Sequence, residues 1–225
     1  MKQKPTASYI LLGLGFILFM LTLYLVFLYV PTEQTMGVVQ RVFYLMVPVG
    51  WLALLSFLVV FIGSILYLSK RSEKWDVIAS SSAEIGLVFT TLAILTGAIW
   101  ARPVWGVWWT WEPRLTATLV LWLIYFAYFA VRSFATEESR GAAFSAVVGI
   151  VGFVDIPIVA LATSLWRGIH PPPLIFEGGL APAMLLTLQV SIFAFTLFYV
   201  LLLIQRVALK NSQIEIRKLK AGADI

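Results

Sequence analysis

Six long apolar runs constrain this chain more than any other feature of its sequence. Runs of about 17 to 25 apolar residues are long enough to cross a hydrocarbon core roughly 30 Å thick. They lie at Tyr9–Val30, Val42–Leu68, Ala83–Trp100, Leu115–Val131, Ala142–Thr163 and Pro182–Ile204. The loops between them are too short for a soluble domain, so we expect one membrane domain over residues 1–225. The predicted fold class is all-α, a polytopic bundle of six transmembrane helices.

The composition excludes several classes of function. Charged residues make up only 12% of the chain, whereas a soluble domain carries about 25%. Cysteine is absent, which rules out disulfides, thiolate metal sites and thiol redox chemistry. The first apolar run is too long for a signal peptide and lacks a cleavage site, so we expect it to remain as a span. The net charge of +5 is explained by topology, and no nucleic acid partner is predicted.

Lysine and arginine are divided unevenly between the two sides of the predicted bundle. Twelve of the 16 fall in the two termini and the second and fourth loops, and the remaining four are Arg41, Arg102, Arg114 and Arg167. The positive-inside rule therefore predicts cytoplasmic termini and an outer location for these four arginines. Arginine can hold a carboxylate through two hydrogen bonds, which lysine cannot do.

Structural motifs account for the features of the inner side. The sequence SSAE at Ser81–Glu84 fits a capping box that would start the third span. Gly13, Gly15, Gly149 and Gly152 are expected to allow close helix contacts. The basic tail KNSQIEIRKLK reads as a segment facing solvent or lipid headgroups.

The most distinctive outer segment is WGVWWTWEPR, residues 105–114. A short interfacial helix over Val104–Trp111 would put Trp105, Trp108 and Trp109 on one face, with Trp111 to the side. Pro113 suits the first turn of the fourth span and leaves Glu112 beside Arg114, near the positive end of that helix. Tryptophan collects at membrane interfaces in any case, but four in seven residues favour a binding platform.

Two further outer segments carry possible ligands for a metal. SLWRGIHPPP contains the only histidine, His170, close to Trp166 and Arg167, and the three prolines would stiffen the chain around it. RVFYLMVPVGW contains Met46, which could fill a gap in the core or act as a soft ligand to haem iron.

An acid inside the fifth span is also out of place. Asp155 in GFVDIPIVA lies nearer the outer end, where a carboxylate is costly unless it is paired or functional. It could be a hydrogen-bonded partner of an outer arginine or a functional group, and in both cases it should face the bundle.

Together these outer features match one ligand. A flat apolar surface suits a macrocycle, a histidine suits iron, and arginines suit carboxylates. We therefore expect haem at the outer surface, with the tryptophans against the ring and some of the four arginines on the propionates.

The residues WGVWWTWEPRLT resemble the tryptophan-rich "WWD" signature of haem-handling proteins of cytochrome c biogenesis. With RVFYLMVPVGW and DIPIVALATSLWRGIHP, the chain from about Arg41 to Pro173 is similar to the CcmC branch of that family. The resemblance implies a bacterial cytoplasmic membrane protein that holds transiently bound, b-type haem on the periplasmic face. It would pass haem to a chaperone like CcmE, beside a CcmA-like ATPase and CcmB-like and CcmD-like membrane subunits. It would not be an enzyme.

The resemblance also assigns roles to single residues. The four tryptophans and Arg114 take the platform role, and His170 matches the second of two histidines associated with the iron. Met46 stands where the first histidine would be, in LMVP, and Glu112 replaces the signature aspartate. Three outcomes stay open: His170 and Met46 together, which would raise the reduction potential relative to two histidines; His170 with water or a chaperone histidine; or weak haem binding. We favour His170 as the single firm ligand.

Two other functions compete with haem delivery. An electron-transfer protein with b-type haem needs two good axial ligands, and this chain has one histidine. A small-molecule transporter would place polar groups at mid-membrane in broken helices, and only Asp155 approaches that pattern.

Overall fold

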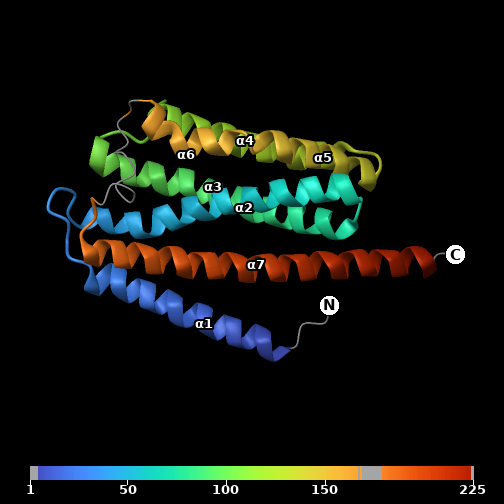
Figure 1. Ribbon diagram of the computed structural model, residues 1–225, viewed down its shortest axis with the longest axis horizontal. Coiled ribbons are helices and arrows are strands. Elements are labelled where there is room, and N and C mark those ends of the chain that lie inside the picture. Colours follow the sequence, from blue (N-terminus) through green and yellow to red (C-terminus); the bar gives the residue numbers. More distant parts are fainter. Residues whose placement is uncertain (1–4, 167, 169–178, 224–225) are drawn as a thin grey trace.

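The computed structural model is an elongated bundle of helices that run along one axis (Figure 1). It describes residues 5–166, 168 and 179–223. The connection at Trp105–Arg114 and the loop after η1 lie at one end of the bundle, which we call the tryptophan end. The opposite end, around Asp76 and Glu84, we call the charged end. Helix α1 begins, and helix α7 ends, toward the charged end (Figure 1).

Seven α-helices and two short helical turns make up the described chain. They are α1 (Pro5–Tyr24), η1 (Leu25–Tyr29), η2 (Val38–Val42), α2 (Phe43–Lys70), α3 (Glu73–Trp105), α4 (Pro113–Phe134), α5 (Glu138–Gly152), α6 (Asp155–Leu165) and α7 (Pro182–Ala223). Six helical segments are long and apolar enough to cross a membrane, as the sequence predicts: Tyr9–Tyr29, Val38–Lys70, Glu73–Trp105, Pro113–Phe134, Glu138–Ala162 and Pro182–Gly222.

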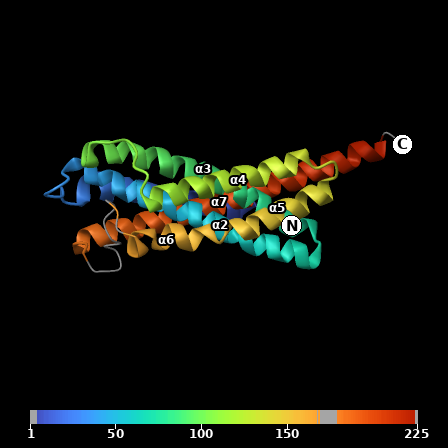
Figure 2. The same cartoon turned by 90° about the horizontal axis from the view of Figure 1, so that it is seen from above.

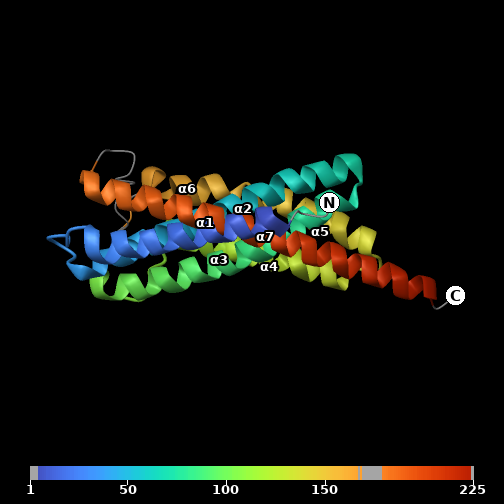
Figure 3. The ribbon, with the colours of Figure 1, turned by 90° about the horizontal axis from the view of Figure 1, so that it is seen from below.

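Helices α2 and α3 form a hairpin at the centre of the bundle. Helices α4, α5 and α6 pack on one side of this hairpin, and α7 packs on the other with α1 outside it (Figures 1 and 3). The core joins all these layers: the Phe57 ring of α2 stacks on Tyr125 of α4 with centroids 3.5 Å apart, and both are fully buried. On the other side Ser82 Oγ of α3 lies 2.8 Å from Tyr199 Oη of α7.

Small residues bring these helices close together. A Cβ atom at Gly149 of α5 would lie 2.9 Å from Val60 Cγ1 of α2, and one at Gly152 would lie 2.6 Å from Ile124 Cγ2 of α4. Gly15 is nearly as crowded, with Leu201 Cδ1 at 3.1 Å. The expectation of close contacts is wrong only for Gly13, which has no such neighbour within 4 Å. It lies on α1, most of whose large side chains are exposed.

The start of the third span differs from the prediction. Helix α3 begins at Glu73, with Ser72 as its N-cap residue, so Ser81–Glu84 is not a capping box. Ser81 and Ser82 are buried in the middle of the helix, and Glu84 instead accepts bonds from Arg206 and Lys210 of α7. The capping-box prediction is wrong because Ser82 and Glu84 of this pattern bond to neighbouring helices.

The fifth span is interrupted between α5 and α6, which follow one another along the bundle (Figure 2). The N–H groups of Phe153, Val154 and Ile156 donate to carbonyls three residues back, in the tighter 3₁₀ pattern. Asp155 begins α6 and is only 9% exposed, so it faces the bundle as expected. Its Oδ2 has no hydrogen-bond partner among the described residues.

Helix α7 does not end where its apolar run ends. It continues through the basic tail to Ala223 and extends past the other helices at the charged end (Figures 1 and 2). The tail is largely exposed, as expected, but Lys210, Arg217 and Lys218 contact the bundle, Lys210 through Glu84 and Ser80. Lys218 Nζ lies 2.9 Å from Glu73 Oε2, and Arg217 pairs with Glu138.

Candidate functional site

The tryptophan segment contains no short interfacial helix, which corrects the sequence prediction. Helix α3 runs through Arg102 and Pro103 and ends at Trp105. Gly106 then takes a left-handed conformation with φ of 77°, and residues 107–112 form no regular helix. Gly106 ends the helix because a glycine enters this conformation without the Cβ clash of other residues.

The four tryptophans of the segment therefore do not share one helical face. Trp105 packs edge-on against Trp100, with centroids 5.2 Å apart, and Trp109 packs edge-on against Trp111 at 5.8 Å. Trp108 and Trp111 are 59% and 76% exposed. Trp100, which the sequence analysis counted only as the end of a span, is buried and supports Trp105 from within the bundle.

Glu112, Pro113 and Arg114 begin α4 in the predicted arrangement. Glu112 is the N-cap residue with an extended backbone (φ −70°, ψ 157°), and Pro113 occupies the first turn. The amide of Thr116 donates to the Glu112 carbonyl at 3.0 Å and closes the first turn. The Glu112 side chain makes no cap bond to its own helix. Arg114 is half-buried on this turn.

The two other described arginines of the tryptophan end, Arg102 and Arg41, bond to backbone carbonyls at helix ends. Arg102 donates to the carbonyl of Gly106, in the turn that ends α3. Arg41 donates from its Nη1 to the carbonyl of Phe27, in the π-helical turn that follows α1. Each side chain therefore has a structural role. The sequence analysis assigned both only to the ligand.

Of the two candidate iron ligands, Met46 lies within the described residues and His170 lies outside them. Met46 is half-buried in the first turn of α2, just before Pro48. His170 and Arg167 lie outside the described residues. Trp166 ends α6 and is 47% exposed. Gly168 follows Arg167 in the sequence and lies close to the tryptophan segment. A Cβ atom built on Gly168 would lie 2.7 Å from Glu112 Oε2, the end of a flexible side chain.

Several buried polar atoms at the tryptophan end have no partner in the described structure. They are Trp109 Nε1, Thr110 Oγ1, Thr116 Oγ1, Trp100 Nε1 and Arg41 Nε. Buried polar groups of native proteins are nearly always hydrogen-bonded. Unsatisfied donors beside exposed indole rings suit a flat ligand that carries acceptor oxygens, and a porphyrin with carboxylates fits that description. Thr110 and Thr116 escaped the sequence analysis because a hydroxyl in an aromatic segment carries no pattern of its own.

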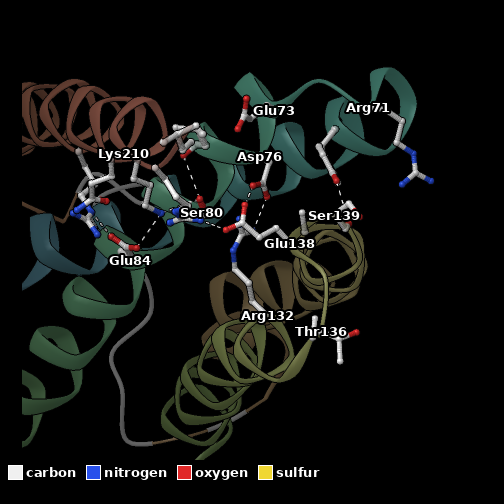
Figure 4. A pocket seen from close by; sticks show the side chains of 18 residues that line it. Arg71, Glu73, Asp76, Ser80, Glu84, Arg132, Thr136, Glu138, Ser139 and Lys210 are labelled. Carbon is white, nitrogen blue, oxygen red and sulfur yellow. Dashed lines mark hydrogen bonds and ion pairs between the residues drawn. The ribbon is translucent and has the colours of Figure 1, made fainter. Parts of the chain in front are cut away.

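The charged end is arranged quite differently. A polar cavity of about 710 Å³ lies there between the ends of α2, α3, α4, α5 and α7. Figure 4 shows Arg132 directed at Asp76, to which it donates two bonds of 2.6 and 2.5 Å. Lys210 Nζ lies 2.9 Å from Glu84 Oε1 and also donates to Ser80 Oγ at 2.9 Å. These ion pairs join α3 to α4 and to α7 across the cavity.

Comparison with known proteins locates the chain in a family. The model of the family described as "CcmC: Heme exporter protein C" matches residues 2–222. This chain belongs to the heme exporter protein C family.

Individual relatives are moderately similar to this chain in sequence. The heme exporter protein C of Bradyrhizobium diazoefficiens is 35% identical over 175 residues, 76% of this chain and 66% of that protein. That of Rhodobacter capsulatus is 32% identical over 199 residues, 87% of this chain and 81% of its own length. A putative cytochrome c biosynthesis ccmC-like mitochondrial protein of Marchantia polymorpha is 29% identical over 170 residues, 76% of this chain and 72% of that protein.

Proposed function

We propose that this protein binds haem at its tryptophan end and presents it for cytochrome c maturation. Membership of the heme exporter protein C family supports a part in haem export for cytochrome c biogenesis. The observation that carries the location is the surface of exposed indoles, Trp108 and Trp111, beside the unpartnered donors Trp109 Nε1 and Thr110 Oγ1. The protein is a transport component in this proposal, and any ATP hydrolysis belongs to a partner subunit.

Each group at the tryptophan end would contribute one kind of contact to haem. The indoles of Trp105, Trp108, Trp109 and Trp111 would cover the macrocycle, with Trp166 at the edge of the surface. Half-buried Arg114 would hold a propionate, because a guanidinium can give a carboxylate two hydrogen bonds. Arg41 and Arg102 would contribute charge, and any direct contact to haem would compete with their present bonds to Phe27 and Gly106 carbonyls. We also propose that Arg167 binds a propionate.

For the iron we propose His170 as the firm ligand. Met46 is the second candidate, since a half-buried thioether in the first turn of α2 is close to the tryptophan end. A single firm ligand suits a protein that must release its cargo, because the remaining axial position exchanges easily.

The remaining parts of the proposal concern the surroundings of the protein. We propose that it lies in the bacterial cytoplasmic membrane with the tryptophan end on the periplasmic side. Haem bound transiently, as b-type haem, would pass to a CcmE-like chaperone. The CcmA-like, CcmB-like and CcmD-like proteins would be the other subunits of the complex.

Haem occupancy of purified variants tests the site. The protein is expressed with haem supplied, purified in detergent, and its Soret absorbance per protein is measured. We expect Soret absorbance in the parent and its loss in His170→Ala. Trp108→Ala and Trp111→Ala should each weaken binding about 5- to 30-fold, because each removes roughly 1 to 2 kcal/mol of ring contact. Both side chains are exposed, so the fold should survive.

Trp75→Ala is the control for the loss of an indole at the charged end, where Trp75 lies half-buried at the start of α3, and its thermal midpoint is measured to exclude a folding defect. It should bind haem as the parent does. A parent without a Soret band would refute haem binding, and a Trp75 variant that loses as much haem as Trp111→Ala would refute the platform. Haem-dependent co-purification of the CcmE-like chaperone separates delivery from electron transfer, because a free-standing cytochrome forms no such complex.

A further inference from the structure

An apolar groove lies on the outside of the bundle between α3 and α7. Its volume of about 540 Å³ is within the range of about 300 to 1,000 Å³ that is usual for small-molecule sites. Ile85, Val88 and Phe89 of α3 and Leu202 and Leu209 of α7 supply its apolar lining. Val88 is 57% exposed and Leu209 is 49% exposed, so the groove opens to the surroundings of the protein.

The groove adjoins the polar cavity of the charged end. Glu84 and Arg206 line both of them. The apolar runs of the two helices also reach their limits here, because the run in α3 begins at Ala83 and the run in α7 ends at Ile204. Most of the groove therefore lies at the depth of the hydrocarbon core, and the cavity lies at the depth of the lipid headgroups. An apolar groove joined to a polar cavity in this way suits an amphipathic ligand.

The charges at this junction favour an anionic headgroup. Arg206 and Lys210 share the single carboxylate of Glu84, so this group of three carries one positive charge in excess. Lys210 Nζ donates to both Glu84 and Ser80 (Figure 4). Arg206 donates to Glu84 through Nε, and its two terminal nitrogens make no bond to the described residues. A guanidinium can hold a phosphate through two hydrogen bonds, so Arg206 is the better phosphate ligand of the two.

We propose that an anionic phospholipid binds at this junction. One acyl chain lies in the groove between α3 and α7, and the phosphate lies against the terminal nitrogens of Arg206. Basic pockets between membrane-spanning helices bind anionic lipid headgroups in other proteins. The site is independent of haem and of the proposed function.

Native mass spectrometry tests the preference for an anionic lipid. The detergent-purified protein is mixed with equal amounts of phosphatidylglycerol and phosphatidylethanolamine that carry the same acyl chains. The lipids that stay bound after release from the micelle are identified by mass. We expect the parent to retain phosphatidylglycerol over phosphatidylethanolamine by about 5-fold or more, because one basic residue strengthens anionic-lipid binding by about that factor. Equal retention of the two lipids would overturn the proposal.

Val88→Trp tests the place of the acyl chain. The indole would fill the groove without changing a charge, and it needs no room in the core because Val88 is exposed. Leu95→Trp is the matched control: Leu95 lies two turns further along the same face of α3, is 55% exposed and does not line the groove. Val88→Trp should lose most of the bound phosphatidylglycerol, and Leu95→Trp should keep it. If both variants retained the same amount, the groove would not hold the lipid.

Arg206→Gln tests the phosphate contact. It should reduce the preference for phosphatidylglycerol by about 5-fold. Arg140→Gln is the control, since it removes an exposed cation that pairs with Glu137 and does not line the cavity, and it should keep the preference. Thermal midpoints are measured for both, because Arg206 also bonds to Glu84. A folded Arg206→Gln protein with the parent's preference would contradict the assignment of the phosphate, and Val88→Trp still decides the site if Arg206→Gln does not fold.

The assembly state distinguishes a lipid from a second copy of this chain in the groove. The molar mass of the parent and of Val88→Trp is measured in detergent by light scattering. We expect the same assembly state for both proteins, with lipid bound to the parent alone. A parent that dimerises without bound phosphatidylglycerol, together with a monomeric Val88→Trp, would show that a second copy fills the groove and would overturn the proposal.

Discussion

The tryptophans of residues 105–111 show how residues of one type acquire different environments. Trp105 is held edge-on against Trp100 at the end of α3, so part of its surface serves the fold. Trp108 and Trp111 project from an irregular segment and remain largely exposed. An exposed indole costs solvation free energy that burial against a ligand or lipid recovers. Single substitutions should therefore separate residues that stabilise the fold from residues that bind.

A prediction at the residue scale concerns the close approach at Gly149. Gly149→Ala places a methyl group 2.9 Å from Val60 Cγ1 and 3.0 Å from Ser64 Oγ. Overpacking of this kind costs about 1 to 3 kcal/mol. We expect a lower thermal midpoint in detergent. Gly13→Ala is the control, because Gly13 has no such neighbour within 4 Å, and it should keep or raise the midpoint. Equal midpoints for the two variants would contradict the packing described here.

At the scale of elements, ion pairs at the charged end join helices that also pack together through the apolar core. Arg132 of α4 holds Asp76 of α3 at the charged end, and Glu84 of α3 holds Lys210 and Arg206 of α7. These charged groups line the cavity at the charged end. Charged side chains inside a membrane-spanning bundle are costly unless they are paired. Helix α3 carries both acids and is the shared partner of α4 and α7.

Asp76→Asn should therefore destabilise the packing of α3 against α4. The substitution removes the charge from a two-bond pair whose Asp76 side chain is only 12% exposed. Hydrogen bonds to charged groups contribute about 1.5 to 3 kcal/mol, so the thermal midpoint should fall. Glu137→Gln removes the exposed pair with Arg140, which contributes about 1 kcal/mol or less. If both variants melted at the same temperature, the Asp76–Arg132 pair would not hold these helices.

For the whole molecule, the two ends of the bundle differ in kind. The charged end contains a polar cavity in whose lining Asp76 pairs with Arg132 and Glu84 pairs with Lys210. The tryptophan end has exposed indoles and buried donors without partners in the described structure. A surface whose polar groups are already paired gains little from a ligand, whereas unpaired donors gain a hydrogen bond. This asymmetry favours a ligand at the tryptophan end.

The orientation of the molecule in the membrane can be tested by labelling single cysteines. Gln34→Cys is exposed at the tryptophan end, and Lys74→Cys is exposed at the charged end. In intact cells a membrane-impermeant maleimide should label Gln34→Cys and leave Lys74→Cys unlabelled. Both should react once the cells are permeabilised. The reverse pattern would contradict the positive-inside prediction and move the proposed haem surface to the cytoplasm.

The residues proposed for the site come from the sequence, because tryptophan, histidine and arginine are rare enough in an apolar chain to be informative, and their roles in binding stay predictions. The start of α4 at Pro113, with Glu112 before it, follows from local rules and is confirmed. The short helix over Val104–Trp111 is wrong, because Gly106 ends α3 after Trp105. The capping box at Ser81–Glu84 is wrong because Glu84 bonds to α7, a partner more than a hundred residues away.

By itself, the amino-acid sequence determines the number of spans, their approximate limits and the family, because hydrophobic runs and a rare motif are local properties of the chain. Contacts between distant residues arise only when the helices pack. Three such contacts join residues that are distant in the sequence: Gly168 with Glu112, Asp76 with Arg132, and Gly149 with Val60. Their distances depend on how the helices cross, and that depends on every side chain in the core at once.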